Sequence, residues 1–512
     1  MVVVKRALLS CHDKTGLEAF AKALTSLGVE LIASGGTAEF LKQQGLRVKS
    51  VEEFAGITEQ LDGRVKTLHP KIHAGILARR DDPAHLTSVG AQGLIDLIVV
   101  NLYPFERTIQ APGVTLAEAI EQIDVGGVAL LRAAAKNFAH VAVISQPQQY
   151  PQVATALRDN KGQLPEGTSQ ELAVAAFRLT SAYDAWIAGY LSPANGRALP
   201  EAAVVSVRRR QALRYGENPH QQGAWYVPMG GPVWGLATLS QLQGKALSYN
   251  NLLDIDAALR CLLDFEAPTC AIIKHHSQCG LASGSTAQQA YERAFACDGE
   301  SAFGGIVGIN RSLTDALARQ LSEPFLEVIV APSVDPQATA VLAKKPHMRV
   351  VTLDWPAKTP PGAEWRQLLG SWILQDADAL AVSYDTLKVM THRTPTAQER
   401  EDLLFAWTAA KHVMSNGIVL AKDLATVGIG QGQPSRVGSV RLAIEKAGER
   451  SRGAVAASDG FFPFVDSVEL LARAGVTAVI QPGGSIRDDE VMAAADAAHI
   501  AMLVTGIRHF RH

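Results

Sequence analysis

Residues 29–45 read VELIASGGTAEFLKQQG, which is an apolar strand, a Gly-Gly turn and a helix in direct succession. The same alternation continues on both sides. A strand at 3–9 precedes a helix at 16–28, and strands at 94–105 and 141–145 flank a helix that opens after Gly126-Gly127. Strands that alternate with helices predict a parallel α/β sheet with right-handed crossovers. Ligands bind such sheets at the carboxyl ends of the strands, where this sequence places its polar turns.

A stretch rich in Pro, Gly and polar residues, SPANGRALPE (192–201), interrupts this pattern. The chain has 512 residues, which exceeds the size of a single core, so we predict two domains, 1–198 and 199–512. The second contains apolar strands such as CAIIK (270–274) and GIVLAK (417–422), interleaved with helices. We therefore expect a second α/β domain, built from two related lobes.

The composition excludes several classes of protein. The net charge is −2 and 47% of the residues are hydrophobic, which favours a packed protein over one that coats polyanions. The five cysteines are irregularly spaced and contain no C-x-x-C, as expected for buried free thiols in a reducing cytosol. There is no signal-peptide pattern and no apolar run near the ~20 residues that span a bilayer. We expect a cytoplasmic protein with neither a nucleic-acid nor a membrane partner.

Two stretches of the first domain predict phosphate binding. Ser34-Gly35-Gly36-Thr37 follows a strand and opens a helix, a geometry that presents backbone N–H groups to an anion. Such turns are also common without a ligand. The second stretch, DGRVKTLHPKIHAGIL (62–77), is either a solvated basic loop or a clamp whose cations need an anion. Neither is a Walker A or dinucleotide motif, which disfavours nucleoside triphosphates and dinucleotides. His69 and His73 are separated by Pro70, which disfavours a helical metal site.

A third cluster consists of Tyr103, Asp124 and Lys136, a phenol, a carboxylate and an amine near strand ends. A lysine on an alanine-rich helix is a candidate proton donor if it is desolvated. The alternative is a surface helix capped by Asp124.

In the second domain, AIIKHHSQCG (271–280) holds Lys274, His275, His276 and Cys279 at the end of an apolar run. From the residues alone it is a metal site, a thiol nucleophile, a proton-transfer pair or a strand entering a turn. Asn416 lies at a strand entrance, and Arg436 lies beside glycines before a helix, as a second anion site would.

Several stretches in order along the whole chain resemble one family, the bifunctional enzymes that join AICAR (phosphoribosylaminoimidazolecarboxamide) formyltransferase to IMP cyclohydrolase. They include SGGTAEFL, DGRVKTLHPKIHAGIL, VNLYPF, DVGGVALLRAAAKN, LRYGENPHQ, LSYNNLLDIDAA, SNGIVLAKD, SDGFFPF and GIRHFRH. The resemblance implies a methylglyoxal-synthase-like (MGS-like) N-terminal domain and a C-terminal domain of cytidine-deaminase-like topology. The zinc deaminase signature, H-x-E with P-C-x-x-C, is missing, so that likeness concerns the fold only.

The resemblance also implies the chemistry. A formyl group passes from 10-formyltetrahydrofolate, a co-substrate, to the 5-amino group of AICAR, and the product closes to IMP with loss of water. No tightly bound cofactor and no metal are implied. The partners are these small molecules, together with a second copy of the chain in a homodimer that shares its transferase sites.

Site residues follow from the same resemblance. His275 takes the amine proton, Lys274 delivers a proton to the folate, and Asn416 orients the formyl group. The residues implied to contact AICAR and folate are Arg214, Tyr215, Gly304, Glu327, Arg436, Phe461, Asp466 and Arg508. Those implied for ring closure are Lys66, Tyr103, Asp124 and Lys136, and those implied to bind its substrate are Ser10, Lys14, Ser34, Gly35, Gly36, Thr37, Arg64, Thr67 and Asn101.

One departure and two alternatives stand beside this interpretation. Bacterial members usually read K-H-x-N-P-C-G, whereas this chain has Ser277-Gln278 in place of Asn-Pro, which removes the rigidity of the proline. The alternatives are a metal-dependent deaminase of the same topology, which would bind zinc, and a non-catalytic nucleotide sensor, which would not need the Lys274–His275 pair.

Overall fold

The structure is a computed structural model that describes residues 1–56, 60–61, 64–109, 111, 113–192, 199–229, 233–356 and 362–512. The chain divides into two compact units, Met1–Arg208 with Pro228–Pro232, and Arg209–Val227 with Val233–His512. The predicted boundary at residue 198 lies outside the described residues. Within those residues, no helix is long and apolar enough to cross a membrane.

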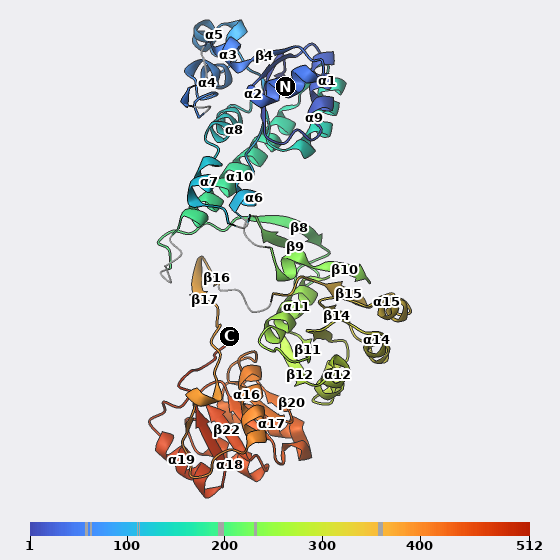
Figure 1. Cartoon of the computed structure of the whole chain (residues 1–512), viewed down its shortest axis with the longest axis vertical. Helices are drawn as coiled ribbons and strands as arrows, with labels where there is room; N and C mark the ends of the chain where they lie inside the picture. Colours follow the sequence, from blue (N-terminus) through green and yellow to red (C-terminus); the bar gives the residue numbers. More distant parts are fainter. Residues whose placement is uncertain are drawn as a thin grey trace. The chain divides into compact units, whose positions relative to one another are not determined.

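The first unit is built on a five-stranded parallel sheet, which confirms the predicted architecture. Its strands, in spatial order, are β4 (Val48–Ser50), β3 (Glu30–Ala33), β2 (Arg6–Cys11), β5 (Leu97–Asn101) and β6 (Ala142–Ile144). The connecting helices are α1 (Leu17–Ser26), α2 (Gly35–Gln43) and α8 (Gly126–Lys136). Helix α8 packs against β5, β6 and the long α10 (Glu166–Leu191), whereas α1 packs against β3 and α9 (Tyr150–Asp159) (Figure 1).

The shorter elements of this unit surround the sheet. They are β1 (Val2–Val3), α3 (Val51–Ala55), α4 (Pro70–Leu77), α5 (Pro83–Val89), α6 (Phe105–Ile109), α7 (Leu116–Glu121) and β7 (Gln163–Leu164).

The strand order places a topological switch point between β2 and β5. Strands β3 and β4 extend the sheet on one side of β2, and β5 and β6 extend it on the other. At the carboxyl ends of the two central strands, Cys11 pairs with Asn101. A crevice for ligands opens at such a point because the chain leaves neighbouring strands in opposite directions.

The second unit contains a twelve-stranded mixed sheet. In spatial order its strands are β10 (Ser240–Gln243), β15 (Arg349–Thr352), β14 (Val328–Ala331), β13 (Ile306–Ile309), β11 (Thr269–Lys274), β12 (Ser277–Ser283), β20 (Ala425–Gly430), β19 (Ile418–Lys422), β21 (Val455–Ser458), β22 (Ala478–Gln481), β23 (Ala501–Val504) and β18 (Lys388–Val389). Its helices are α11 (Tyr249–Leu262), α12 (Ala287–Phe295), α13 (Gly299–Ala302), α14 (Asp315–Leu321), α15 (Pro336–Leu342), α16 (Ala397–Ala410), α17 (Arg436–Ala447), α18 (Asp466–Arg473) and α19 (Asp488–Ala497).

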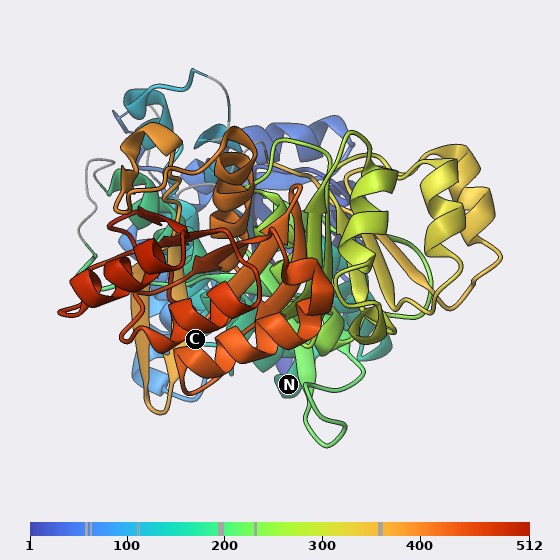
Figure 2. The ribbon, with the colours of Figure 1, turned by 90° about the horizontal axis from the view of Figure 1, so that it is seen from below.

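This sheet consists of two lobes with one topology, as the sequence predicted. In the first lobe the antiparallel hairpin β11–β12 is followed by β13, β14 and β15, and in the second β19–β20 is followed by β21, β22 and β23. The lobes meet where β12 pairs with β20. The first lobe is green to yellow and the second is orange to red in Figures 1 and 2.

Two hairpins stand apart from the large sheets. Strands β8 (Val207–Leu213) and β9 (Gly223–Pro228) form one, and β16 (Ala363–Leu368) and β17 (Ser371–Asp376) form the other. All five cysteines lie among the described residues as buried free thiols, as expected, and burial raises the pKa of each.

Candidate active sites

The predicted phosphate site of the first unit lies at the carboxyl ends of β2 and β3. Ser10 Oγ and Ser34 Oγ are 2.8 Å apart. Thr37 Oγ1, in the first turn of α2, accepts a hydrogen bond from the Cys11 N–H at 3.0 Å and donates to the Cys11 carbonyl at 3.1 Å. Lys14 Nζ donates to the Cys11 carbonyl, and burial lowers the pKa of its ammonium group. Hydroxyls, an ammonium and a helix N-terminus converge here, which is the chemistry that holds an anion.

Lys66 lies close to the N-terminus of α2, beside Gly35, and Thr67 lies close to the N-terminus of α8, beside Gly126. A Cβ atom on Gly35 would lie 2.5 Å from Lys66 Nζ, and one on Gly126 would lie 2.7 Å from Thr67 Oγ1. Only glycine at these positions lets the two polar groups come so close to the first turns of α2 and α8. Arg64 is exposed and forms an ion pair with Glu121.

Asp124 is the carboxylate predicted for catalysis in this unit, and it is half-buried. Its Oδ1 accepts a hydrogen bond from the Gly127 N–H at 2.7 Å, and its own N–H donates to Tyr183 Oη at 2.8 Å. Burial raises the pKa of Asp124, although hydrogen bonds from the Gly127 and Tyr103 backbones oppose the rise. The Asp124 carboxylate thus binds an N–H of the first turn of α8 from just before the N-cap residue Val125, and it also lies beside Tyr103.

Lys136 is exposed at the last residue of α8, far from Asp124 along the helix. At 1.5 Å per residue, α8 is about 15 Å long, so a single chain does not bring the Lys136 amine to the Asp124 end. Asn101 is closer to the site, because its amide Oδ1 accepts from the Asp13 N–H at 2.8 Å and its Nδ2 donates to the Asp13 carbonyl at 2.9 Å. The role of Lys136 therefore stays a prediction.

In the second unit, a cavity of about 440 Å³ collects many of the predicted residues. Those on its wall are Arg214, Tyr215, Lys274, His275, Gly304 and Glu327. The wall also contains residues that the sequence analysis did not single out, among them Lys245, Asn250, Asp254 and Arg349. Arg349 forms an ion pair with Glu327, which links a predicted substrate contact to the first residue of β15.

Lys274 and His275 occupy the end of the β11–β12 hairpin. Lys274 pairs with Ser277, so His275 and His276 form a two-residue turn, with φ of +52° and +63°. Lys274 Nζ donates to the Phe303 carbonyl at 2.7 Å, and the His275 side chain is exposed to the cavity. An ammonium and an exposed imidazole on neighbouring residues suit proton transfer.

The remaining residues of AIIKHHSQCG have other surroundings. Burial raises the pKa of Cys279 to about 12, so its thiol stays protonated and is a poor nucleophile. Ser277 and Gln278 both pair with β11, and the Gln278 side chain is buried with its Nε2 3.5 Å from the Ala409 carbonyl. Ser277 and Gln278, which replace Asn-Pro, are therefore part of the paired strand β12, beside a register shift between Ile272 and Ile273.

A second group of predicted residues gathers in the second lobe. Asn416 Oδ1 accepts a hydrogen bond from Arg436 Nη2 at 3.0 Å, and the buried Arg436 also forms an ion pair with the fully buried Asp459. A Cβ atom on Gly460 would lie 2.5 Å from Arg436 Nη2 and 2.7 Å from the Phe510 ring. The chain terminus is therefore packed against this group.

Three further predicted residues border it. The Arg508 guanidinium lies 4.8 Å from the centroid of the Phe510 ring. The Phe461 side chain is exposed, and Asp466 begins α18, where its carboxylate accepts from the Ser467 N–H at 2.7 Å. Of the described residues, none of this second group lines the cavity that holds Lys274 and His275. The predicted transferase residues thus fall into two separate groups, one around Lys274 and His275 and one around Asn416 and Arg436.

Sequence reasoning missed two carboxylates that contact these two groups, Asp254 and Asp459. Both lie inside stretches that carried the family resemblance, LSYNNLLDIDAA and SDGFFPF. Asp459 is an aspartate beside glycine in a loop otherwise noted for its aromatic residues, and Asp254 resembles an ordinary polar position of an amphipathic helix. No local pattern marks their partners, which are far away in the sequence.

Comparisons with known proteins cover nearly the whole chain. A family model described as AICARFT/IMPCHase bienzyme matches residues 134–446, and one described as MGS-like domain matches residues 16–129. The bifunctional purine biosynthesis protein PurH of Roseobacter denitrificans is 48% identical over 99% of both chains. That of Bacillus cereus is 46% identical over 99% of this chain and 100% of its own length. A crystal structure of ForH is 37% identical and covers 38% of this chain and 99% of its own, with a TM-score of 0.34.

Proposed function

The chain belongs to the AICARFT/IMPCHase bienzyme family, and from this premise we propose how its residues perform the two reactions of the family. It is a bifunctional enzyme of purine biosynthesis, an AICAR formyltransferase and an IMP cyclohydrolase. The observation that supports the residue assignment best is the cavity that holds Lys274 and His275 together with Arg214, Tyr215 and Glu327.

Formyl transfer takes place at the cavity of the second unit. The AICAR amine is a weak nucleophile because its lone pair is delocalised into the imidazole and the carboxamide. His275 removes the amine proton as the nitrogen forms its bond to the formyl carbon. The bond from that carbon to N10 of 10-formyltetrahydrofolate breaks, and Lys274 supplies the proton that N10 gains. Asn416, held by Arg436, orients the formyl oxygen.

Ring closure takes place at the switch point of the first unit. The ribose phosphate is bound by Ser10, Ser34 and Thr37 beside the N-terminus of α2, and by Thr67, which lies beside the N-terminus of α8. The carboxamide nitrogen attacks the formyl carbon, and Lys66 and Tyr103 stabilise the oxygen that develops negative charge. Asp124 accepts the proton that the nitrogen loses, since burial raises its pKa and makes it a stronger base than an ordinary aspartate. Asp124 returns that proton to the oxygen, and the resulting hydroxyl leaves as water with the proton of the formylated nitrogen, which yields IMP.

The active transferase is a homodimer in which each site joins two half-sites from different subunits, the Lys274–His275 group and the Asn416–Arg436 group. The separation of Lys274 and His275 from the Asn416–Arg436 group supports this arrangement, because one cavity in one chain does not contain both. The β16–β17 hairpin offers a surface for the second copy. Trp365 and Trp372 pack against each other on it and are exposed by 42% and 59%. A two-stranded hairpin is marginally stable without a partner surface.

Cytoplasmic localisation and the absence of a tightly bound cofactor belong to the same proposal. The chemistry above needs only two co-substrates, and no step requires electron transfer.

The His275→Ala variant tests the assignment. It should lose formyl transfer, measured as tetrahydrofolate release from AICAR and 10-formyltetrahydrofolate, and keep ring closure of supplied formyl-AICAR. His276→Ala is the matched control on the neighbouring turn residue and should retain most of the transferase activity. If His275→Ala transfers formyl at the wild-type rate, the site assignment is wrong.

A further inference from the structure

We propose that Asp254 is a positioning residue for formyl transfer: from α11 it fixes the backbone of the His275–His276 turn and so holds His275 and Lys274 in reactive geometry. The inference rests on the proposed role of these two residues. It adds a residue that has no proton-transfer task of its own.

The contact is direct. Asp254 Oδ1 accepts a hydrogen bond from the His276 N–H at 2.7 Å. The side chain is half-buried on the wall of the cavity. The carboxylate thus binds a backbone amide of the turn that carries the proposed base.

The turn needs such support because of its sequence. Both residues have φ in the left-handed region, at +52° and +63°. Two-residue hairpin turns with two positive φ values favour Asn-Gly, since a residue with a Cβ atom is disfavoured in that region. His-His has no glycine to relieve that cost. The hydrogen bond that Asp254 accepts from the turn therefore selects a conformation that the two histidines do not prefer by themselves.

The second lobe contains an equivalent contact between an aspartate and a hairpin turn, but its turn has no predicted catalytic residue. Asp402 on α16 accepts hydrogen bonds from the Asp423 N–H at 3.0 Å and the Leu424 N–H at 2.7 Å. Asp423 and Leu424 have φ of +53° and +59° and form the β19–β20 turn, after Lys422.

The two hairpins also share a register shift. It falls between Ile272 and Ile273 in the first and between Leu420 and Ala421 in the second. In both lobes an aspartate on the helix before the hairpin thus stabilises the hairpin turn. Of these two turns, the one in the first lobe places a histidine in a cavity.

A role in binding substrate is the competing interpretation, because Asp254 lines the cavity. The two roles predict different kinetics. A residue that orients the base lowers kcat and leaves the KM for AICAR nearly unchanged, whereas a substrate contact made before the transition state raises KM.

The test is a double-mutant cycle between Asp254 and His276, with steady-state kinetics of formyl transfer. Asp254→Ala should lower kcat about 10- to 100-fold, as expected for loss of a hydrogen bond to a charged group, with KM for AICAR within about twofold. Asp254→Asn keeps an oxygen that accepts from an N–H, and its kcat should lie within about fivefold of wild type. Adding His276→Gly to Asp254→Ala should recover about tenfold in kcat, because glycine adopts positive φ freely.

Asp256→Ala is the matched control. Asp256 lies two residues along the same helix and pairs with Arg260 at 2.7 Å, not with the turn, so its kcat should stay near wild type. The proposal is overturned if His276→Gly fails to rescue Asp254→Ala, if Asp254→Asn is as slow as Asp254→Ala, or if Asp254→Ala raises KM at unchanged kcat. If the wild type itself transfers no formyl group, both the proposed function and the positioning role of Asp254 are wrong.

Discussion

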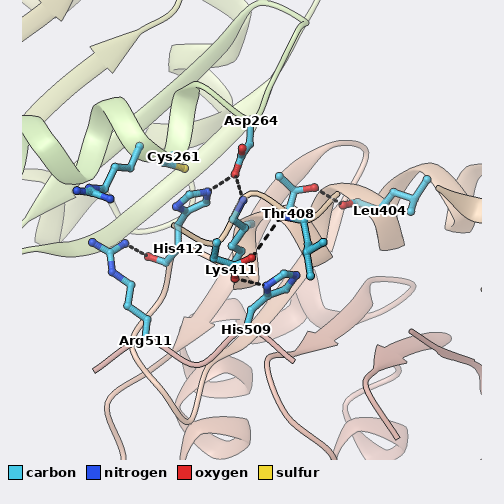
Figure 3. Close-up of polar contacts among 12 residues, drawn as sticks. Cys261, Asp264, Leu404, Thr408, Lys411, His412, His509 and Arg511 are labelled. Carbon is cyan, nitrogen blue, oxygen red and sulfur yellow. Dashed lines mark hydrogen bonds and ion pairs between the residues drawn. The ribbon is translucent and has the colours of Figure 1, made fainter. Parts of the chain in front are cut away.

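Asp264 Oδ2 lies 2.6 Å from His412 Nε2 and 3.0 Å from Lys411 Nζ, which joins the end of α11 in the first lobe to the end of α16 in the second. Figure 3 shows both side chains pointing at the same carboxylate, with Arg511 beside them. Arg511 Nη1 donates to the His412 carbonyl at 3.3 Å, so the chain terminus is tied to the same cluster. Lys411 and His412 lie a few residues before Asn416 in the sequence. Their contacts with Asp264 therefore link the segment that leads to Asn416 with the end of α11, the helix that carries Asp254.

Replacement of Asp264 by Asn should destabilise the second unit. The Lys411 side chain is only 11% exposed and would lose its anion, and breaking a buried ion pair costs about 3 kcal/mol. The measurement is the urea midpoint of the second unit by tryptophan fluorescence. Glu469→Gln removes an exposed pair with Arg473 and should change stability by less than about 0.5 kcal/mol. Equal effects for the two variants would contradict a special role of the cluster.

The same variant has a predicted pH dependence. Burial alone would raise the pKa of Asp264, but the hydrogen bond from His412 and the charge of Lys411 outweigh burial and lower it. The stabilisation is therefore complete above the unfolded-state pKa of about 3.9 and is lost as the pH falls through the lower folded-state value. The stability difference between wild type and Asp264→Asn should shrink in acid. A difference that grows below about pH 4 would contradict this sign.

As the pH is lowered, ring closure should lose activity at a higher pH than it would if its catalytic base had the pKa of an ordinary aspartate. The folded-state pKa of Asp124 is raised by burial, so the carboxylate is protonated, and unable to accept a proton, already above the usual value of about 3.9. The pH profile of kcat for supplied formyl-AICAR should show this acidic limb. Asp124→Asn should lower the plateau strongly and remove the limb. A limb that persists unchanged in the variant would assign it to another group.

Two inactive variants should complement each other if the transferase sites are shared. His275→Ala damages one half-site and Asn416→Ala the other. A heterodimer purified through two different tags then has one intact site of two and should show about half of the wild-type transferase activity. Each homodimeric variant alone should stay inactive. A heterodimer without activity would place both half-sites of a working centre in one chain.

The β16–β17 hairpin should govern assembly. Trp365→Ser with Trp372→Ser removes most of its exposed aromatic surface, and we expect the dimer to dissociate at concentrations at least about tenfold higher than for wild type. Analytical ultracentrifugation measures the change. Ile486→Ser is a control, because Ile486 is fully exposed outside the hairpin. Unchanged dissociation of the double variant would exclude the hairpin from the interface.

Periodicity predicted the fold of the first unit because its strands are short apolar runs between amphipathic helices, and such runs pair in parallel when helices connect them. The Ser34–Thr37 turn was located for the same reason, since strand, turn and helix are adjacent in the chain. The two lobes of the second unit were also anticipated. Their antiparallel hairpins were not, because a two-residue turn made of His-His or Asp-Leu carries no glycine signal.

The sequence by itself determined which chemical groups the protein possesses: the Lys274–His275 pair, the cations of DGRVKTLHP, and five cysteines without the spacing of a metal site. Tertiary structure alone decided how these groups are held. Asp254 binds the N–H of His276, which is 22 residues away in the sequence, and Arg436 binds Asn416, which is 20 residues away. Lys136 lies at the opposite end of α8 from Asp124. Hydrogen bonds of this kind depend on the register of helices against a sheet, a property of the packed core that no local stretch of sequence contains.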